Sequence, residues 1–176
     1  MRSTRMLALV LLALPLMALT GRAPARSDDH QDVLNAIAAM TKADSGLAKF
    51  LKGSAGYAVF PTIGKGAIGI GGAHGDGELI VGGTALGETS MTQITIGFQL
   101  GGQSYSEIIF FEDAKTLANF QKGDFEFAAQ VSAVALKAGA SANAKYANGV
   151  AVFTMAKGGL MYEASVGGQK FSYKKY

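Results

Sequence analysis

The chain has no cysteine among its 176 residues. Disulfide bonds, thiol nucleophiles and thiolate metal sites are therefore excluded, and stability has to come from packing and from hydrogen bonds between strands. A lipoprotein anchor also requires a cysteine, and Arg22 stands where that residue would follow Leu19-Thr20-Gly21. We therefore expect no lipoprotein cysteine and no covalent lipid anchor.

Charged residues are scarce as well. They make up 16% of the sequence, against about a quarter in an average globular protein, and there is no tryptophan and only two histidines. Glycine is abundant, at 24 residues, and the hydrophobic share of 49% is sufficient for a core. A chain of this length supports one domain. So few charges favour strands buried on both faces, or a surface that meets lipid or a partner.

Catalytic motifs are also missing. The sequence contains no G-x-S-x-G elbow and no P-loop. Residues 64–69, Gly-Lys-Gly-Ala-Ile-Gly, match the G-x-G-x-x-G pattern of dinucleotide sites, but that pattern requires a helix directly afterwards. Gly71, Gly72 and Gly75 follow instead, and a helix would not tolerate them. We therefore predict a protein that is not an enzyme and that binds no cofactor.

His74, Asp76 and Glu78 are residue types that ligate metals. Their spacing of two would place all three on one side of a strand. The alternative is a hairpin turn at Gly75-Asp76-Gly77, since Asp-Gly is a strong hairpin signal and a turn would separate the three side chains. We favour the turn and predict no metal site.

Residues 1–25 have the layout of a secretory signal peptide. Arg2 and Arg5 precede fourteen apolar residues, Met6–Leu19, and Ala23-Pro24-Ala25 offers small residues at a cleavage point. The apolar stretch is shorter than the roughly 20 residues that a spanning helix needs, and an uncleaved anchor is the alternative. We expect cleavage after Ala25 and export to the periplasm or the cell envelope.

Cleavage of that leader changes the charge balance. It removes three arginines from sixteen basic residues and leaves thirteen, which equals the number of acids. The formal net charge of +3 then falls to zero. The sequence therefore gives no indication of a nucleic-acid partner.

The periodicity of apolar residues predicts the fold. Helical spacing between Ser27 and Lys52 indicates one amphipathic helix, capped by Ser27 and docked on its own sheet, with a membrane-surface helix as the alternative. After Gly53 the period changes to two, and a second, short helix is predicted at Asp113–Phe120 with Asp113 as its cap. The predicted strands are Tyr57–Phe60 (closed by Pro61), residues 66–72, 78–83, 93–100, Tyr105–Phe111, residues 125–133, Val150–Met155, Leu160–Val166 and Gln169–Tyr173. Residues 26–176 thus form a single α+β domain, a curved antiparallel sheet, open or closed to a barrel, covered by the N-terminal amphipathic helix and the short internal helix.

Three lysines, Lys65, Lys157 and Lys170, stand beside glycines and close to predicted strand ends. A lysine next to bare backbone amides can hold phosphate as a point charge. The alternative is that all three are ordinary solvated lysines. We select them as candidate ligand-binding residues and expect Lys65 and Lys157 to meet a lipid headgroup.

Several motifs resemble the SYLF domain family. Residues 56–61, Gly-Tyr-Ala-Val-Phe-Pro, followed by Lys65-Gly66-Ala67, resemble the opening of that domain. Residues 96–104 are similar to its central glycine-glutamine strand, and residues 152–154 with 157–161 are similar to its C-terminal signature. The Lys-Gly-Leu of that signature is one residue longer here, because it contains two glycines. The resemblance extends from about residue 30 to residue 173.

The resemblance implies lipid binding without catalysis. SYLF domains of eukaryotes are associated with phosphoinositides and, in one yeast branch, with actin filaments, and bacterial relatives are exported. An exported protein would not meet actin, so we expect a non-enzymatic module of the bacterial cell envelope that binds phospholipid, another amphiphile or a membrane surface, with acyl chains sheltered on a sheet face. The alternatives are a protein-interaction or structural envelope module and a small outer-membrane barrel. The sequence identifies no protein partner.

Overall fold

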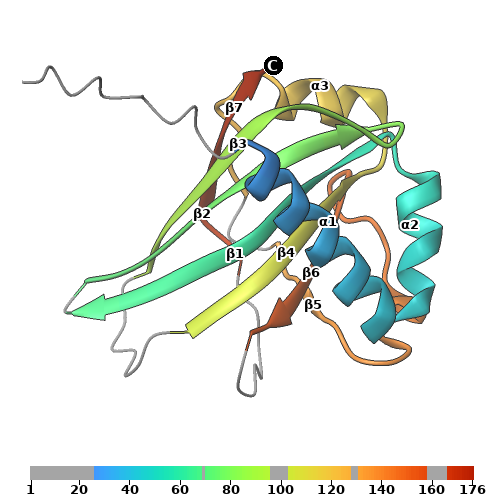
Figure 1. Cartoon of the computed structure of the whole chain (residues 1–176), viewed down its shortest axis with the longest axis horizontal. Coiled ribbons are helices and arrows are strands. Elements are labelled where there is room, and N and C mark those ends of the chain that lie inside the picture. The colour runs from blue at the N-terminus through green and yellow to red at the C-terminus, as the bar shows by residue number, and fades with distance from the viewer. Residues whose placement is uncertain (1–25, 69, 96–102, 128–130, 158–165) are drawn as a thin grey trace, which may run out of the picture.

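The computed structural model describes residues 26–68, 70–95, 103–127, 131–157 and 166–176. Seven strands form one sheet in the order β5-β6-β4-β1-β2-β3-β7, in which all neighbours are antiparallel except β5 and β6 (Figure 1). The strands are β1 (Gly56–Ile68), β2 (Ile70–Val81), β3 (Thr84–Thr95), β4 (Gln103–Phe111), β5 (Val134–Ala135), β6 (Val150–Ala156) and β7 (Gln169–Lys175). The helical elements are α1 (Arg26–Ala43), η1 (Ser45–Leu47), α2 (Ala48–Gly53), α3 (Ala114–Phe120) and η2 (Ala140–Asn143). The predicted α+β class is confirmed. Among the described helices, none is long and apolar enough to cross a membrane.

Helices α1 and α2 cover one face of the sheet, and α1 crosses it obliquely (Figure 1). Their apolar side chains are buried against β1, β4 and β6 in a cluster that we call the α1-side core: Val33, Ala36, Met40, Leu47, Phe50, Val59, Ile80, Ile108, Phe110, Ala151 and Phe153. The single helix predicted between Ser27 and Lys52 is wrong, because Asp44 ends α1. The backbone of Asp44 is extended, and its carboxylate accepts a hydrogen bond of 3.0 Å from Gly46 N, so that a new helical segment begins.

The opposite face carries a core rich in phenylalanine. The α3-side core consists of Ala58, Phe60, Ile63, Ala73, Leu79, Met91, Tyr105, Ile109, Phe111, Phe120, Phe127, Val131, Val150, Val152, Val166 and Phe171. Helix α3 is packed into it through Phe120, whose ring centroid lies 4.8 Å from that of Phe111. The cap predicted for this helix is confirmed, since Asp113 accepts a hydrogen bond of 2.8 Å from Thr116 N.

The central strand β1 contains a bulge at Pro61. Between Val59 and Gly64, β1 has one residue more than the paired segment of β2. The register of β1 against β4 also shifts, between Phe60 and Ile63. Proline lacks an N–H group, and a bulge is a position at which an inner strand tolerates it. The hydroxyl of Ser106 donates a hydrogen bond of 2.7 Å to the Pro61 carbonyl. The prediction that Pro61 closes a strand ending at Phe60 is therefore wrong.

Two glycines of β2 lie against this bulge. A Cβ atom at Gly77 would overlap the carbonyl oxygen of Val59, and one at Gly75 would lie 2.8 Å from the carbonyl oxygen of Thr62. Glycine is thus required here for close backbone approach and not for a turn. The predicted hairpin turn at Gly75-Asp76-Gly77 is wrong, and β2 continues through it. The turn lies at residues 82–83, where two glycines have φ values of 59° and 82°, as a two-residue hairpin requires.

The sheet is not closed, because β5 and β7 occupy its two edges in the described part of the chain. The long strand predicted at residues 125–133 is not found in the described part of that segment, where Glu126 forms an isolated bridge with Lys170 and β5 starts only at Val134. The predicted strand residues 96–100 and 160–165 lie outside the described residues.

The close approach at Gly77 leads to a stability prediction. We expect Gly77→Ala to lower the free energy of unfolding by about 2–3 kcal/mol, because the added methyl group would push the two central strands apart at the bulge. Gly64→Ala is the matched control, since a Cβ at this position of β1 would meet nothing within 4 Å, and its effect should stay within about 0.5 kcal/mol. Urea denaturation followed by circular dichroism measures both, and equal effects would contradict the proposed role of Gly77.

Candidate functional site

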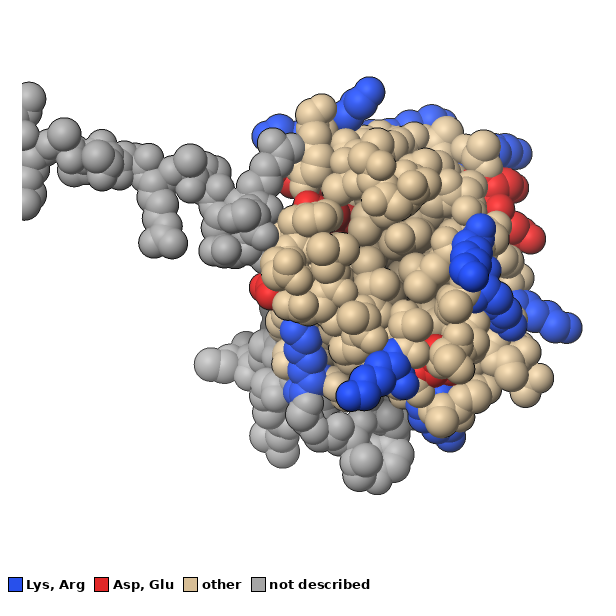
Figure 2. Space-filling model, turned by 45° about the vertical axis from the view of Figure 1, so that its right-hand side comes forward, with Lys and Arg blue, Asp and Glu red and all other residues tan. Residues whose placement is uncertain are grey.

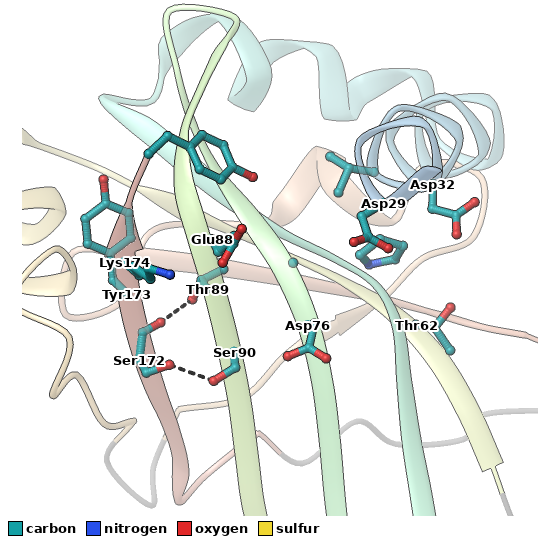
Figure 3. Close-up of a pocket in the computed structure, with 14 residues that line it drawn as sticks. Asp29, Asp32, Thr62, Asp76, Glu88, Thr89, Ser90, Ser172, Tyr173 and Lys174 are labelled. Carbon is teal, nitrogen blue, oxygen red and sulfur yellow. Dashed lines mark hydrogen bonds between the residues drawn. The ribbon is translucent and has the colours of Figure 1, made fainter. Parts of the chain in front are cut away.

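A groove of about 850 Å³ opens between the start of α1 and strands β2, β3 and β7 (Figure 3). Its walls combine apolar surface, from residues such as Val33 and Tyr176, with carboxylates and hydroxyls. The lining residues are Asp29, Asp32, Val33, Pro61, Thr62, Asp76, Gly77, Glu88, Thr89, Ser90, Ser172, Tyr173, Lys174 and Tyr176. Four of them are carboxylates and one is a lysine, so the groove carries a negative potential. It is therefore suited to a cationic group and unsuited to phosphate.

The buried carboxylate of Glu78 adjoins this groove. Glu78 is only 4% exposed, and its Oε1 accepts a hydrogen bond of 2.6 Å from the hydroxyl of Tyr176. Nδ1 of His30 lies 2.6 Å from its other oxygen, Oε2. A carboxylate tolerates burial only with partners of this kind. The contacts tie α1 and the residue after β7 to the middle of the sheet.

Glu78 is thereby separated from the two residues that share its side of β2. Nε2 of His74 lies 3.5 Å from Oδ2 of Asp76, and both side chains are exposed. The three possible metal ligands lie on the same side of β2, because the strand is not interrupted by a turn. Glu78, however, is bound by His30 and Tyr176. Within the described ranges, no group of three or more His, Asp or Glu side chains is placed to hold a metal ion.

The hydroxyl groups of the groove are engaged with one another and with the backbone. Oγ1 of Thr89 donates to the carbonyl of Ser172 at 2.7 Å, and the hydroxyls of Ser90 and Ser172 are 2.6 Å apart. Figure 3 shows these contacts along the facing edges of β3 and β7. None of these three hydroxyls is hydrogen-bonded to a histidine or a carboxylate in the described structure, so no activated nucleophile is formed there.

Two of the three predicted lysines, Lys157 and Lys170, do not come together. Lys157 and Lys170 lie at opposite ends of one row of paired residues that crosses the sheet through Ser104, Gly64, His74 and Thr92. Five strand spacings of about 4.8 Å separate them by roughly 24 Å. Lys157 donates to the hydroxyl of Thr62 at 2.6 Å, and Lys170 lies 3.6 Å from Glu126. Lys65 is placed on β1 opposite Ala73 and Gln103. One headgroup could not reach both Lys157 and Lys170.

A different set of lysines gathers around α2 and η2. We call it the lysine face; all five side chains are exposed, and they belong to Lys42, Lys49, Lys52, Lys137 and Lys145. In Figure 2 the side of the molecule that carries α2 has turned forward, and basic side chains project from it around a broad uncharged surface, with a few acidic side chains beside them. The helical spacing of Lys49 and Lys52 could have indicated an exposed basic stripe, but nothing in the sequence placed Lys137 and Lys145 beside it.

Two contacts hold this surface together. Oδ2 of the buried Asp44 accepts a hydrogen bond of 2.6 Å from Ser141 N, which joins the start of η1 to η2. The rings of Phe50 and Tyr146 meet edge to face, with centroids 5.6 Å apart. Hydrogen bonds from the backbone of Ser141 and of Gly46 hold the pKa of Asp44 below its ordinary value, although burial opposes this effect.

Comparison with known proteins identifies relatives of part of the chain. Residues 92–175 match a family model, Ysc84, which is described as "Las17-binding protein actin regulator". A stretch of 72 residues is 33% identical to "Beta cell expansion factor A" of Aeromonas veronii. This match covers 41% of the present chain and 28% of that protein, so it spans little more than a quarter of the relative's length.

Glu78 and Asp76 provide a matched pair for mutation. We expect Glu78→Ala to lower the free energy of unfolding by about 2–3 kcal/mol, because it removes the carboxylate that contacts His30 and accepts a hydrogen bond from Tyr176, and it leaves an empty buried volume. Asp76→Ala, two residues away on the same side of β2 but exposed, should change it by less than about 0.5 kcal/mol. Thermal and urea denaturation measure both. A Glu78 variant as stable as the Asp76 variant would show that the contacts of Glu78 contribute little.

The lowered pKa of Asp44 predicts a pH dependence. A carboxyl group whose pKa is lower in the folded state stabilises the fold above its ordinary value of 3.8, and the contribution disappears as the pH falls through the folded value. Asp44→Asn should therefore cost about 1–2 kcal/mol at neutral pH. The difference from the unaltered protein should shrink below about pH 4. Denaturation curves at several pH values test this, and a difference that stayed constant down to acid pH would contradict it.

Proposed function

We propose, from the premise that residues 92–175 carry the sequence of a Ysc84 (SYLF) domain, that this protein is a non-enzymatic module that binds phospholipid membranes in the bacterial cell envelope. The family match is the observation that carries the proposal, because the resemblance implies lipid binding without catalysis. The family description names Las17 binding and actin regulation for other members, and we do not propose these functions for this protein. The export of the chain and its place in the envelope are part of the proposal.

Contact with the membrane surface fits the described structure better than shelter for an acyl chain. Both faces of the sheet are filled by the protein's own side chains, including Phe60, Phe110 and Phe153, all completely buried. The groove that adjoins β3 and β7 carries four carboxylates beside its apolar surface. An acyl chain placed there would bring its phosphate headgroup close to these negative charges. We therefore place the lipid contact on the exterior of the domain.

The acidic groove supports a second candidate function, that of a protein-interaction module. Its carboxylates would attract a lysine- or arginine-rich segment of a partner protein, and the hydroxyls around them could accept further hydrogen bonds. Charge-neutralising changes at Asp32 and Glu88 would then abolish capture of a partner from envelope extract, while binding to vesicles persisted.

The proposed function predicts selective binding to anionic lipid. The protein without residues 1–25 should co-sediment with phosphatidylcholine vesicles that contain about a third phosphatidylglycerol, and much less with phosphatidylcholine alone, because charge attraction supplies the affinity. Binding should weaken as salt shortens the Debye length to about 8 Å near physiological strength. Equal failure to sediment with both vesicles, at low salt as well, would refute the proposal.

A further inference from the structure

We infer that the lysine face, and not the row that contains Lys157 and Lys170, is the surface that lies against an anionic membrane. This inference rests on the proposed function and specifies its partner surface. The lysine face combines residues from the end of α1, from α2 and from both sides of η2. The partner that we infer for this face is a lipid bilayer with negatively charged phosphate headgroups.

The five lysines have no carboxylate partners in the described structure. Ion pairs of the described residues involve His30, His74 and Lys170, and none involves the lysine face. The sequence explains this lack of acids, because no Asp or Glu occurs between Glu126 and Glu163. Asp44 is buried and satisfied by Ser141. None of the five lysines is therefore paired with a carboxylate in the described structure, and the nearest acid shown to act on this surface is Glu112, which after burial helps to raise the pKa of Tyr146.

The face also has firm support. Phe50 anchors α2 in the α1-side core, with ring centroids 4.9 Å from Phe153 and 5.5 Å from Phe110. Lys49 and Lys52 flank this anchor on the exposed side of the helix. On the other half of the surface, Lys145 precedes Tyr146, which packs against the same Phe50. The lysines are thus presented from a fixed scaffold, so little backbone ordering is needed on binding.

A lipid surface fits this face better than a protein does. Protein interfaces depend on a few large anchors, usually aromatic residues or arginine, that fill pockets of the partner. The large apolar side chains that are exposed in the described structure are Leu34 and Tyr176, and neither belongs to the lysine face. Its exposed uncharged positions include the small residues Ala138 and Ala142, whereas Tyr146 is only partly exposed and packs against Phe50. Spread lysines without an anchor match headgroups that can move to meet them.

The position of the groove agrees with this orientation. Element η2 contacts β5, at one edge of the sheet, whereas the acidic groove lies over β2, β3 and β7, towards the other edge. A molecule that rests on its lysine face therefore turns its repelling carboxylates away from the phosphate layer. The opposite placement would bring Asp29, Asp32 and Glu88 near the headgroups.

The test compares four double variants that each remove two positive charges. Lys49→Gln/Lys52→Gln and Lys137→Gln/Lys145→Gln alter the lysine face. Lys115→Gln/Lys122→Gln is the matched control, because both residues are exposed and belong to α3 and its end, on the other face of the sheet. Lys157→Gln/Lys170→Gln tests the competing row. Circular dichroism and thermal denaturation confirm that all four variants are folded.

Partitioning into phosphatidylcholine vesicles with about a third phosphatidylglycerol is measured at low and at physiological salt. Each lysine near an anionic surface contributes about fivefold to partitioning, so each lysine-face variant should bind roughly 10- to 25-fold more weakly at low salt. The α3 control and the competing row should lose less than about threefold, through long-range attraction alone. These differences should become smaller at high salt.

The outcomes separate the inference from the proposed function. If the unaltered protein binds the anionic vesicles and all four variants bind equally well, or the competing row loses most, the lysine face is refuted while membrane binding stands. If the unaltered protein binds no vesicle, the proposed function fails and the inference fails with it. If the lysine-face changes abolish self-association in sedimentation velocity without affecting vesicle binding, the face is occupied by the acidic groove of a second copy, and the inference is overturned.

Discussion

The additional residue of β1 at Pro61 is the constraint on which the arrangement of the sheet depends. β1 is the central strand of seven, and an insertion of one residue reverses the alternation of side chains along a strand. Phe60 and Ile63 are three residues apart, and yet both belong to the α3-side core. On the other face, the residues of β1 before the bulge belong to the α1-side core, and those after it, such as Thr62 and Gly64, are exposed. The glycines of β2 are the complement of this bulge.

The bulge also divides the α1 side of the sheet into an apolar and a polar half. α1 covers the apolar half of its sheet face, and the remaining half is polar and borders the acidic groove. The lysine face lies beyond the opposite edge, around α2 and η2. The few charges of the chain are thus separated in space, so that net charge alone says little about its partners. The surface proposed for the membrane carries lysines, whereas the groove carries carboxylates.

Local signals in the sequence predicted what depends on local chemistry. The cap of α3 by Asp113 follows from a carboxylate before a helical pattern, and β4, β6 and β7 follow from their apolar residues. Glycines were the difficulty, because the sequence does not show whether a glycine forms a turn or makes room for a neighbouring strand. Gly77 allows close approach of the Val59 carbonyl, whereas Gly82 has a positive φ and forms a turn. This difference is visible only in the structure. The break at Asp44 depends on a local contact with Gly46 N, whereas its contact with Ser141, 97 positions away, is not visible in the sequence. The lysine face depends on the same distant contact, and the separation of Lys157 from Lys170 depends on strand order, which periodicity does not contain.

The carboxylate groove and the lysine face lie towards opposite edges of the sheet, and this separation contributes to a dipole moment along it. In the electric field outside a negatively charged bilayer, a dipole experiences a torque before any atoms touch. Such a torque would shorten the rotational search of each encounter. The alignment would vanish as soon as the field is screened.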